Sequence, residues 1–347
     1  MYRKVIIGVS SITAIVLAIL FVLLNSATMP NERKNGFQRT LLGDTVRTLQ
    51  QIGTKVPFDK ICGLTSDHFF VTVPNPEWLF MVDQGLKKQR LFHLPLKVDE
   101  EIISHNIFVD SPWVYILANN LSAMLYTKLE SKKMDTIKFL TPAYTRSVRI
   151  SPNYTIIRGF DTAMKEQIFK KIDNTTGKVV TEASIIRGLN DVGLGSDGML
   201  KYDELTHRLL YIQYYQNTFY CLDTNLAIIY KGKTIDTVKT NSISVRNLEI
   251  GGDDYLMPAN ARVEINSDSY VDNGNLYVIS KLIADNEEMS TFRENAVVDM
   301  YRVADGKYVR SFYIPYIKGE KVKSILIKKN FLIAIYDTHI GTYRIKT

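Results

Sequence analysis

The sequence of 347 residues has little cysteine and lacks the usual marks of a metal or redox centre. Its two cysteines, Cys62 and Cys221, lie far apart, and neither belongs to a C-x-x-C pair. We therefore expect two free, buried thiols and no disulfide. With 46% hydrophobic and 23% charged residues, 19 Gly and 10 Pro, the composition also excludes a disordered chain, a collagen-like fibre and a disulfide-stapled mini-protein.

A strong excess of one charge is also missing. The 43 Lys and Arg residues outnumber the 36 Asp and Glu residues by only seven. The basic residues are scattered as isolated pairs, whereas nucleic-acid binding needs Lys and Arg clustered on one face. The charge pattern predicts a mixed, solvated surface and no nucleic-acid partner.

Only one apolar run is long enough to span a bilayer, and it covers residues 5–24 without a charge. Arg3 and Lys4 precede it, which favours insertion with the N-terminus inside. A cleaved signal peptide is the alternative, but its apolar core is normally about 7–15 residues long. We expect a retained single-pass anchor in the cytoplasmic membrane at 1–27, a linker at 28–38, and a domain at 39–347 outside the cytoplasm, in the periplasm.

From about residue 40 onward, apolar residues show no helical period. Short runs rich in Tyr, Ile, Val, Phe and Leu alternate with turn residues, which is typical of antiparallel strands. One kind of run recurs six times, beginning at residues 68, 113, 153, 207, 275 and 330. Such a period is typical of propeller blades. The sequence predicts an all-β, six-bladed β-propeller of four-stranded antiparallel blades, preceded by one transmembrane helix. Two β-sandwiches, the alternative, would not account for the repeat.

The two ends of the domain predict how the ring closes. The last repeat stops after its third strand, and residues 39–50 precede the first blade without another assignment. We expect residues 39–50 to form the missing outer strand beside the final strand of the chain. Such a closure removes an exposed sheet edge.

Two phrases of the repeat, TFYCLDTN at 218–225 and DMYRVADGKYV at 299–309, resemble those of TolB-like or NHL-like six-bladed propellers. The opening, an apolar anchor followed by Asn-Gly-Phe-Gln-Arg at 35–39, resembles membrane-anchored propeller proteins of Bacteroidota type. The resemblance covers about residues 37–347. It implies an architecture, and it assigns no catalytic residue.

Three long connections, 181–198, 232–262 and 283–296, fall on one face of the predicted ring, around blades four and five. Loops held by a rigid frame commonly carry function. The predicted binding residues on this face are Arg187, Asn190, Asp191, Asp253, Asp254, Tyr255, Arg262, Glu287, Glu288 and Arg293. Because the closing strand begins on the opposite face, we expect the short-loop face to point toward the membrane.

Motifs for catalysis or metal binding are lacking. H-E-x-x-H and G-x-S-x-G do not occur, and no two of the five histidines have a metal-site spacing. The Gly-Gly-Asp-Asp stretch at 251–254 is more typical of a solvated turn than of a calcium site. We expect no catalytic residue, no metal and no cofactor.

These observations favour a binding or scaffold module for protein or peptide partners in the cell envelope. The alternative is a propeller enzyme of the quinoprotein-dehydrogenase or lactonase type, with a calcium or quinone site at the axial mouth. Asn153, His207 and Asn275 would contribute to that site. They begin strands at the end that lies away from the long connections.

Overall fold

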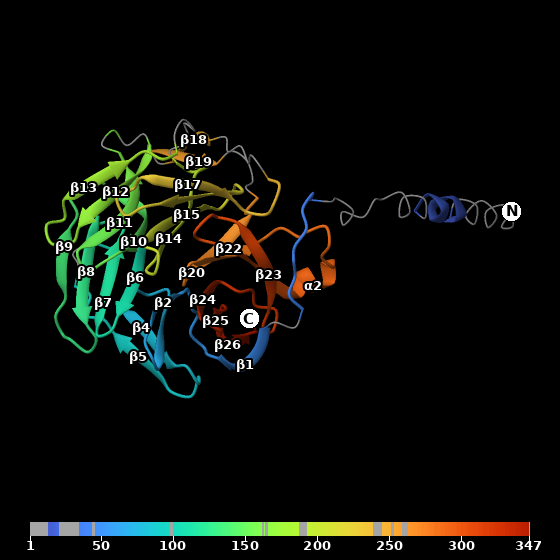
Figure 1. Ribbon diagram of the computed structural model, residues 1–347, viewed down its shortest axis with the longest axis horizontal. Helices are drawn as coiled ribbons and strands as arrows, with labels where there is room; N and C mark the ends of the chain where they lie inside the picture. The colour runs from blue at the N-terminus through green and yellow to red at the C-terminus, as the bar shows by residue number, and fades with distance from the viewer. Residues whose placement is uncertain are drawn as a thin grey trace, which may run out of the picture.

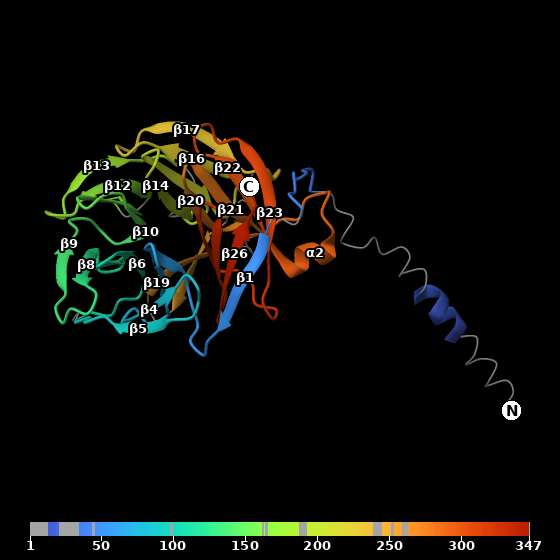
Figure 2. The same cartoon turned by 60° about the horizontal axis from the view of Figure 1, so that its bottom comes forward.

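The computed structural model describes residues 13–20, 35–43, 46–97, 100–161, 163, 166–186, 193–238, 245–250, 253–258 and 263–346. Within these ranges the chain forms six four-stranded antiparallel sheets and one two-stranded hairpin. The sheets follow one another around a ring as the blades of a propeller (Figure 1, Figure 2). The all-β, six-bladed prediction is confirmed.

The first three blades each use four consecutive strands. Blade one contains β2 (Ile61–Leu64), β3 (His68–Thr72), β4 (Trp78–Asp83) and β5 (Gln89–His93). Blade two contains β6 (His105–Asp110), β7 (Trp113–Ala118), β8 (Ala123–Lys128) and β9 (Asp135–Lys138). Blade three contains β10 (Tyr144–Arg149), β11 (Tyr154–Phe160), β12 (Gln167–Asp173) and β13 (Val179–Ala183).

The other three blades include the closing one. Blade four contains β14 (Gly198–Asp203), β15 (Arg208–Gln213), β16 (Thr218–Leu222) and β17 (Ile228–Lys233). Blade five contains β20 (Asn266–Asp272), β21 (Asn275–Ser280), β22 (Asn295–Arg302) and β23 (Tyr308–Pro315). Blade six contains β24 (Ser324–Lys328), β25 (Phe331–Ile335), β26 (His339–Ile345) and β1 (Val46–Gly53).

The first strand of each blade lies nearest the axis. This follows from contacts between the first strands of neighbouring blades, which join β2 to β6, β10 to β14, β14 to β20, β20 to β24 and β24 to β2. The apolar core is divided into clusters between adjacent blades. Between blades three and four, for example, Ile156 and Phe169 pack with Leu209 and Tyr211. Each blade therefore needs apolar residues on both faces, which explains its continuous runs of Val, Ile, Leu and Phe.

Strand β1 closes the ring. It pairs antiparallel with β26, with Val46 opposite Ile345 and Gly53 opposite His339. The predicted closure is confirmed, but the strand begins at Val46 and not at Arg39. The residues before it serve another purpose, because Leu41 forms a bridge with Ser311 in β23 of blade five.

The predicted membrane anchor is described only in part. Residues 13–20 form a helix whose side chains are exposed. In the described ranges, no helix is both long and apolar enough to cross a bilayer. The remainder of residues 5–24 lies outside the described residues, and the predicted domain boundaries stay predictions.

The three long connections lie where the repeat placed them. They join β13 to β14 (residues 184–197), β17 to β20 (234–265) and β21 to β22 (281–294). The second carries the hairpin of β18 (Val245–Ile250) and β19 (Asp253–Pro258), and the third carries the helix α2 (Met289–Glu294). The strand pairing puts all three on one side of the ring, since the first strand of a blade begins where its second strand ends. We call this side the insertion face.

Candidate functional site

The structure describes the side chains of three predicted binding residues, Glu287, Glu288 and Arg293. Asp253, Asp254 and Tyr255 lie in β19, where only the backbone is described. Arg187, Asn190, Asp191 and Arg262 lie outside the described residues. The predicted site is thus located only at blade five, at the connection that carries α2.

Glu287 does not face solvent. Its side chain is fully buried and forms an ion pair with Arg39. The hydroxyl of Tyr313 donates to Glu287 Oε1 at 2.5 Å, and the backbone N–H of Ala284 donates to Oε2 at 2.6 Å. Glu287 therefore holds the shape of the insertion.

Arg39 also binds Asp299, in the middle of β22. The guanidinium donates to both carboxylate oxygens, from Nε at 2.8 Å and from Nη2 at 3.1 Å. It donates from Nη1 to the carbonyl of Leu282 at 2.9 Å, and the Ser311 hydroxyl donates to Asp299 Oδ1 at 2.5 Å. Burial alone would lower the pKa of Arg39, but the Asp299 and Glu287 carboxylates outweigh burial and raise the pKa. The guanidinium is therefore a permanent charge inside the protein.

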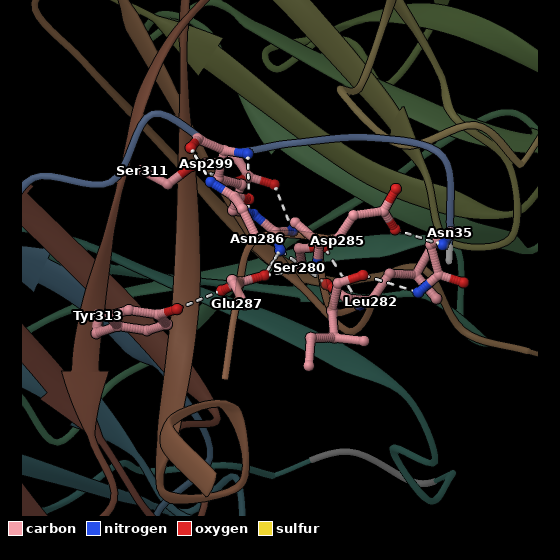
Figure 3. Close-up of polar contacts among 12 residues, drawn as sticks. Asn35, Ser280, Leu282, Asp285, Asn286, Glu287, Asp299, Ser311 and Tyr313 are labelled. Carbon is pink, nitrogen blue, oxygen red and sulfur yellow. Dashed lines mark hydrogen bonds and ion pairs between the residues drawn. The ribbon is translucent and has the colours of Figure 1, made fainter. Parts of the chain in front are cut away.

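The residues just before Arg39 bind the same insertion. The Asp285 carboxylate accepts from the backbone N–H of Asn35 at 2.6 Å and of Gly36 at 3.1 Å (Figure 3). The Asp285 N–H donates to the carbonyl of Phe37 at 2.9 Å. We call these contacts, with those of Arg39, the N-terminal latch.

The latch shows on which side the N-terminal segment reaches the ring. Asn35 contacts Asp285 in one insertion, and its carbonyl accepts from the hydroxyl of Thr237 in another. Residues 35–43 therefore start at the insertion face and pass along β23 before β1 begins. We expected the short-loop face to point toward the membrane because the closing strand begins on that face. Since the chain before this strand comes from the insertion face, the expectation no longer has support.

Helix α2 carries the two predicted residues that face solvent. Glu288, at its N-cap, and Arg293, in its last turn, are both exposed, and the helix has no buried residue. The helix stands at the edge of blade five, next to the latch (Figure 1). These two side chains are the described members of the predicted site that solvent reaches.

A second polar cluster, which the sequence did not indicate, lies between blades three and four. Arg158 is fully buried and donates from Nη2 to the Ser196 hydroxyl at 2.7 Å and to the Gly193 carbonyl at 3.0 Å. Its Nη1 lies 3.6 Å from Asp197 Oδ1, and Arg146 Nη2 donates to Asp197 Oδ2 at 2.5 Å. The cluster fixes residues 193–197, the described end of the first insertion.

A third polar group follows the first strands around the axis. Lys60 donates to Asn106 Oδ1, and Asn106 Nδ2 donates to the Ser147 hydroxyl at 2.9 Å. Lys201 Nζ lies 3.5 Å from Asp268 Oδ1. Burial, followed by the charge of Lys201, lowers the pKa of Lys60 to about 8. In the sequence, this group is indicated only by charged residues in or beside the innermost strands. These residues can be recognised only after the strands have been assigned to blades.

The residues named for an enzyme site lie elsewhere. Asn153, His207 and Asn275 precede or begin second strands, on the side away from the insertions. His207 has a φ of 53° and its Nδ1 is 2.9 Å from the Tyr202 hydroxyl, so it belongs to a turn. In the part of the chain that is described, no group of three or more His, Cys, Asp or Glu residues could hold a metal ion. Both cysteines are free and buried, as predicted.

Comparisons with known proteins support the fold. No family model and no curated protein sequence matches the chain. A member of the DUF4221 family from Bacteroides vulgatus superposes with a TM-score of 0.53 at 12% identity, over 88% of this chain and 99% of that one. A catalytically inactive virginiamycin B lyase from Staphylococcus aureus, with quinupristin, superposes with a TM-score of 0.51 at 11% identity, over 86% and 99%. At such low identity these likenesses show a shared propeller architecture and nothing about activity.

Proposed function

We propose that this protein is a non-catalytic binding module whose insertion face receives a protein or peptide partner in the cell envelope. The observation that carries the proposal is the latch. It uses a buried arginine and two buried carboxylates to hold one inserted loop in a fixed shape. Buried charges are expensive to place and need complete pairing, so this network indicates that the shape of the loop matters.

Rigid loops suit recognition. A loop that is ordered before binding loses little conformational entropy when a partner arrives, so more of the contact energy appears as affinity. The latch orders the insertion at 281–294, and the Arg158 cluster orders the end of the insertion at 184–197. Glu288 and Arg293 on α2 supply exposed charges of both signs beside the latch.

The membrane part of the proposal rests on residues 5–24, a charge-free run of the length that a bilayer requires. Eleven residue steps separate Leu24 from Asn35, and a fully extended chain spans about 3.5 Å per residue. Asn35 would then lie within about 40 Å of the bilayer. We therefore place the propeller on the periplasmic side of the cytoplasmic membrane, with the latch edge of the insertion face nearest the lipid.

Site-specific photo-crosslinking in living cells tests the binding face. A photoreactive amino acid at Glu288 or Arg293 reports on the insertion face. One at Lys132, an exposed residue between β8 and β9 on the other face, is the matched control. We expect one discrete adduct from the first two positions and none from Lys132. Adducts of equal yield from both faces, or none from α2, would contradict the proposed binding face.

A further inference from the structure

Two lysines from opposite sides of the ring belong to the polar group around the axis. Lys60 precedes the inner strand of blade one and Lys201 lies in the inner strand of blade four. Polar contacts run from strand to strand between them, from Lys60 through Asn106 to Ser147, and from Arg146 to the carbonyl of Gly198 in the strand of Lys201. Asp268 is the one carboxylate of the described residues that pairs with Lys201, at 3.5 Å. In the same ranges Lys60 forms no ion pair, and its ammonium donates to the neutral amide of Asn106.

Two arginines add to the positive charge beside the lysines. Arg146 and Arg158 share the single carboxylate of Asp197, at 2.5 and 3.6 Å. Arg146 is followed by Ser147, whose hydroxyl accepts from the Asn106 amide that binds Lys60, so the arginines adjoin the lysine group along the inner strands. Arg146 also lies over the Tyr214 ring, with its Cζ 5.4 Å from the ring centroid.

The charges of this axial mouth do not balance. Its half-buried or buried members comprise four cations and two carboxylates, namely Lys60, Arg146, Arg158, Lys201, Asp197 and Asp268. Burial raises the pKa of the nearby Cys62 thiol and lowers that of His105, so both are neutral at pH 7. Asp59 and Glu264 are exposed, where water screens their charge. An excess of two positive charges is therefore held where solvent compensates it poorly.

The mouth is accessible to a small ligand. The side chains of Lys201 and Arg146 keep 31% of their surface exposed. The inner strands that bear this group begin at the insertion face, so a ligand would enter from there. A hydrogen bond between a charged donor and an anion contributes about 1.5–3 kcal/mol, which makes an anion the natural counterpart of two lysines that share one carboxylate.

We propose that the axial mouth binds an oxyanion, a carboxylate or phosphate group, between Lys60 and Lys201. The two ammonium groups hold the oxygens of the ligand, and Arg146 and Arg158 raise the local positive potential. Asn106 orients Lys60 through their hydrogen bond. This site goes beyond the proposed partner-binding role and does not depend on it.

Isothermal titration of the full-length protein with inorganic phosphate, and separately with succinate, tests the site at constant ionic strength set with NaCl. We expect saturable binding of at least one probe, and the probe that binds more tightly identifies the ligand chemistry. Lys60→Met and Lys201→Met should each weaken binding by about tenfold or more, equivalent to about 1.4 kcal/mol. Lys328→Met is the control, because Lys328 pairs with Asp272 at the far ends of their strands and is 57% exposed.

A second measurement keeps the test independent of folding. Bound anion should raise the pKa of Lys60 above its value of about 8, which the pH dependence of acylation at this amine reports in the unmodified sequence. Absence of saturable binding by both probes overturns the proposal. So does binding that survives in Lys60→Met and Lys201→Met, or an unchanged Lys60 titration at saturating probe. None of these results bears on the crosslinking at α2.

Discussion

Arg39 holds both carboxylate oxygens of Asp299, at 2.8 and 3.1 Å, across 260 positions of the chain. The pair joins the segment before β1 to the centre of blade five. Strand β1 then passes to blade six, where it pairs with β26. The N-terminal segment therefore ties together the last two blades, by a buried ion pair to one and by a strand to the other.

Removal of the Arg39 charge should strongly destabilise the protein. Arg39→Met leaves the Asp299 and Glu287 carboxylates buried without a cation, which typically costs about 3–5 kcal/mol. Urea unfolding followed by circular dichroism measures the loss. Arg90→Met is the control, since Arg90 pairs with Glu130 on the surface and its side chain is 56% exposed. There we expect less than about 1 kcal/mol. If Arg39→Met does not fold, Arg39→Lys retains the charge and should fold with intermediate stability.

A charge reversal on the closing strand should stabilise the ring. Arg47 in β1 lies directly opposite Arg344 in β26, and both are exposed. Like charges at opposed positions destabilise a sheet, so Arg47→Glu should raise the free energy of unfolding by about 0.5 kcal/mol. Adding Arg344→Glu restores a like-charged pair and should cancel the gain. The gain should also shrink in 1 M salt. If the single variant is no more stable than the wild type, the two strands are not paired in this register.

Gly177 should tolerate no side chain. It has a φ of +68°, and a Cβ built there would lie 1.9 Å from the carbonyl oxygen of Lys138 in the neighbouring blade. Gly177→Ala should cost more than about 2 kcal/mol, from the backbone conformation and the clash together. Gly319 has a φ of +83° with nothing within 4 Å of its Cβ position, so Gly319→Ala should cost about 1 kcal/mol. Equal losses in urea unfolding would contradict the close approach at Gly177.

The stability of the protein should depend on pH through Lys60. Burial and the charge of Lys201 lower the pKa of Lys60 from 10.5 to about 8. Between these values the unfolded chain keeps a proton that the folded chain has released, so the free energy of unfolding rises with pH across this window.

Lys60→Met removes this dependence. The stability of the variant relative to the wild type should therefore fall by up to about 3 kcal/mol between pH 8 and 10.5. Urea unfolding at several pH values measures the difference, with Lys328→Met as the surface control. Parallel pH curves for the wild type and Lys60→Met would rule out a perturbed lysine.

The repeat pattern predicted the fold because blade strands are apolar on both faces and end at turn residues, a local signal. The closure by β1 followed from counting strands. The latch was not predicted, because Arg39 was assigned to a strand and Glu287 to a binding surface. One signal was present: Asp299 lies within an apolar strand, where a buried carboxylate needs a cation. The identity of that cation depends on long-range packing, which no local pattern contains.

The pairing of β1 with β26 also constrains how the protein is made. During synthesis, β1 leaves the ribosome long before Ile345, its partner at one end of the pairing, has been added. In the finished ring, its apolar residues Val46 and Ile52 pack against the clusters of blades five, six and one. Until β26 is present, these two side chains remain exposed to water. Blade six can therefore assemble only after β26 has been synthesised, and a variant that lacks β26 should be a target for proteases.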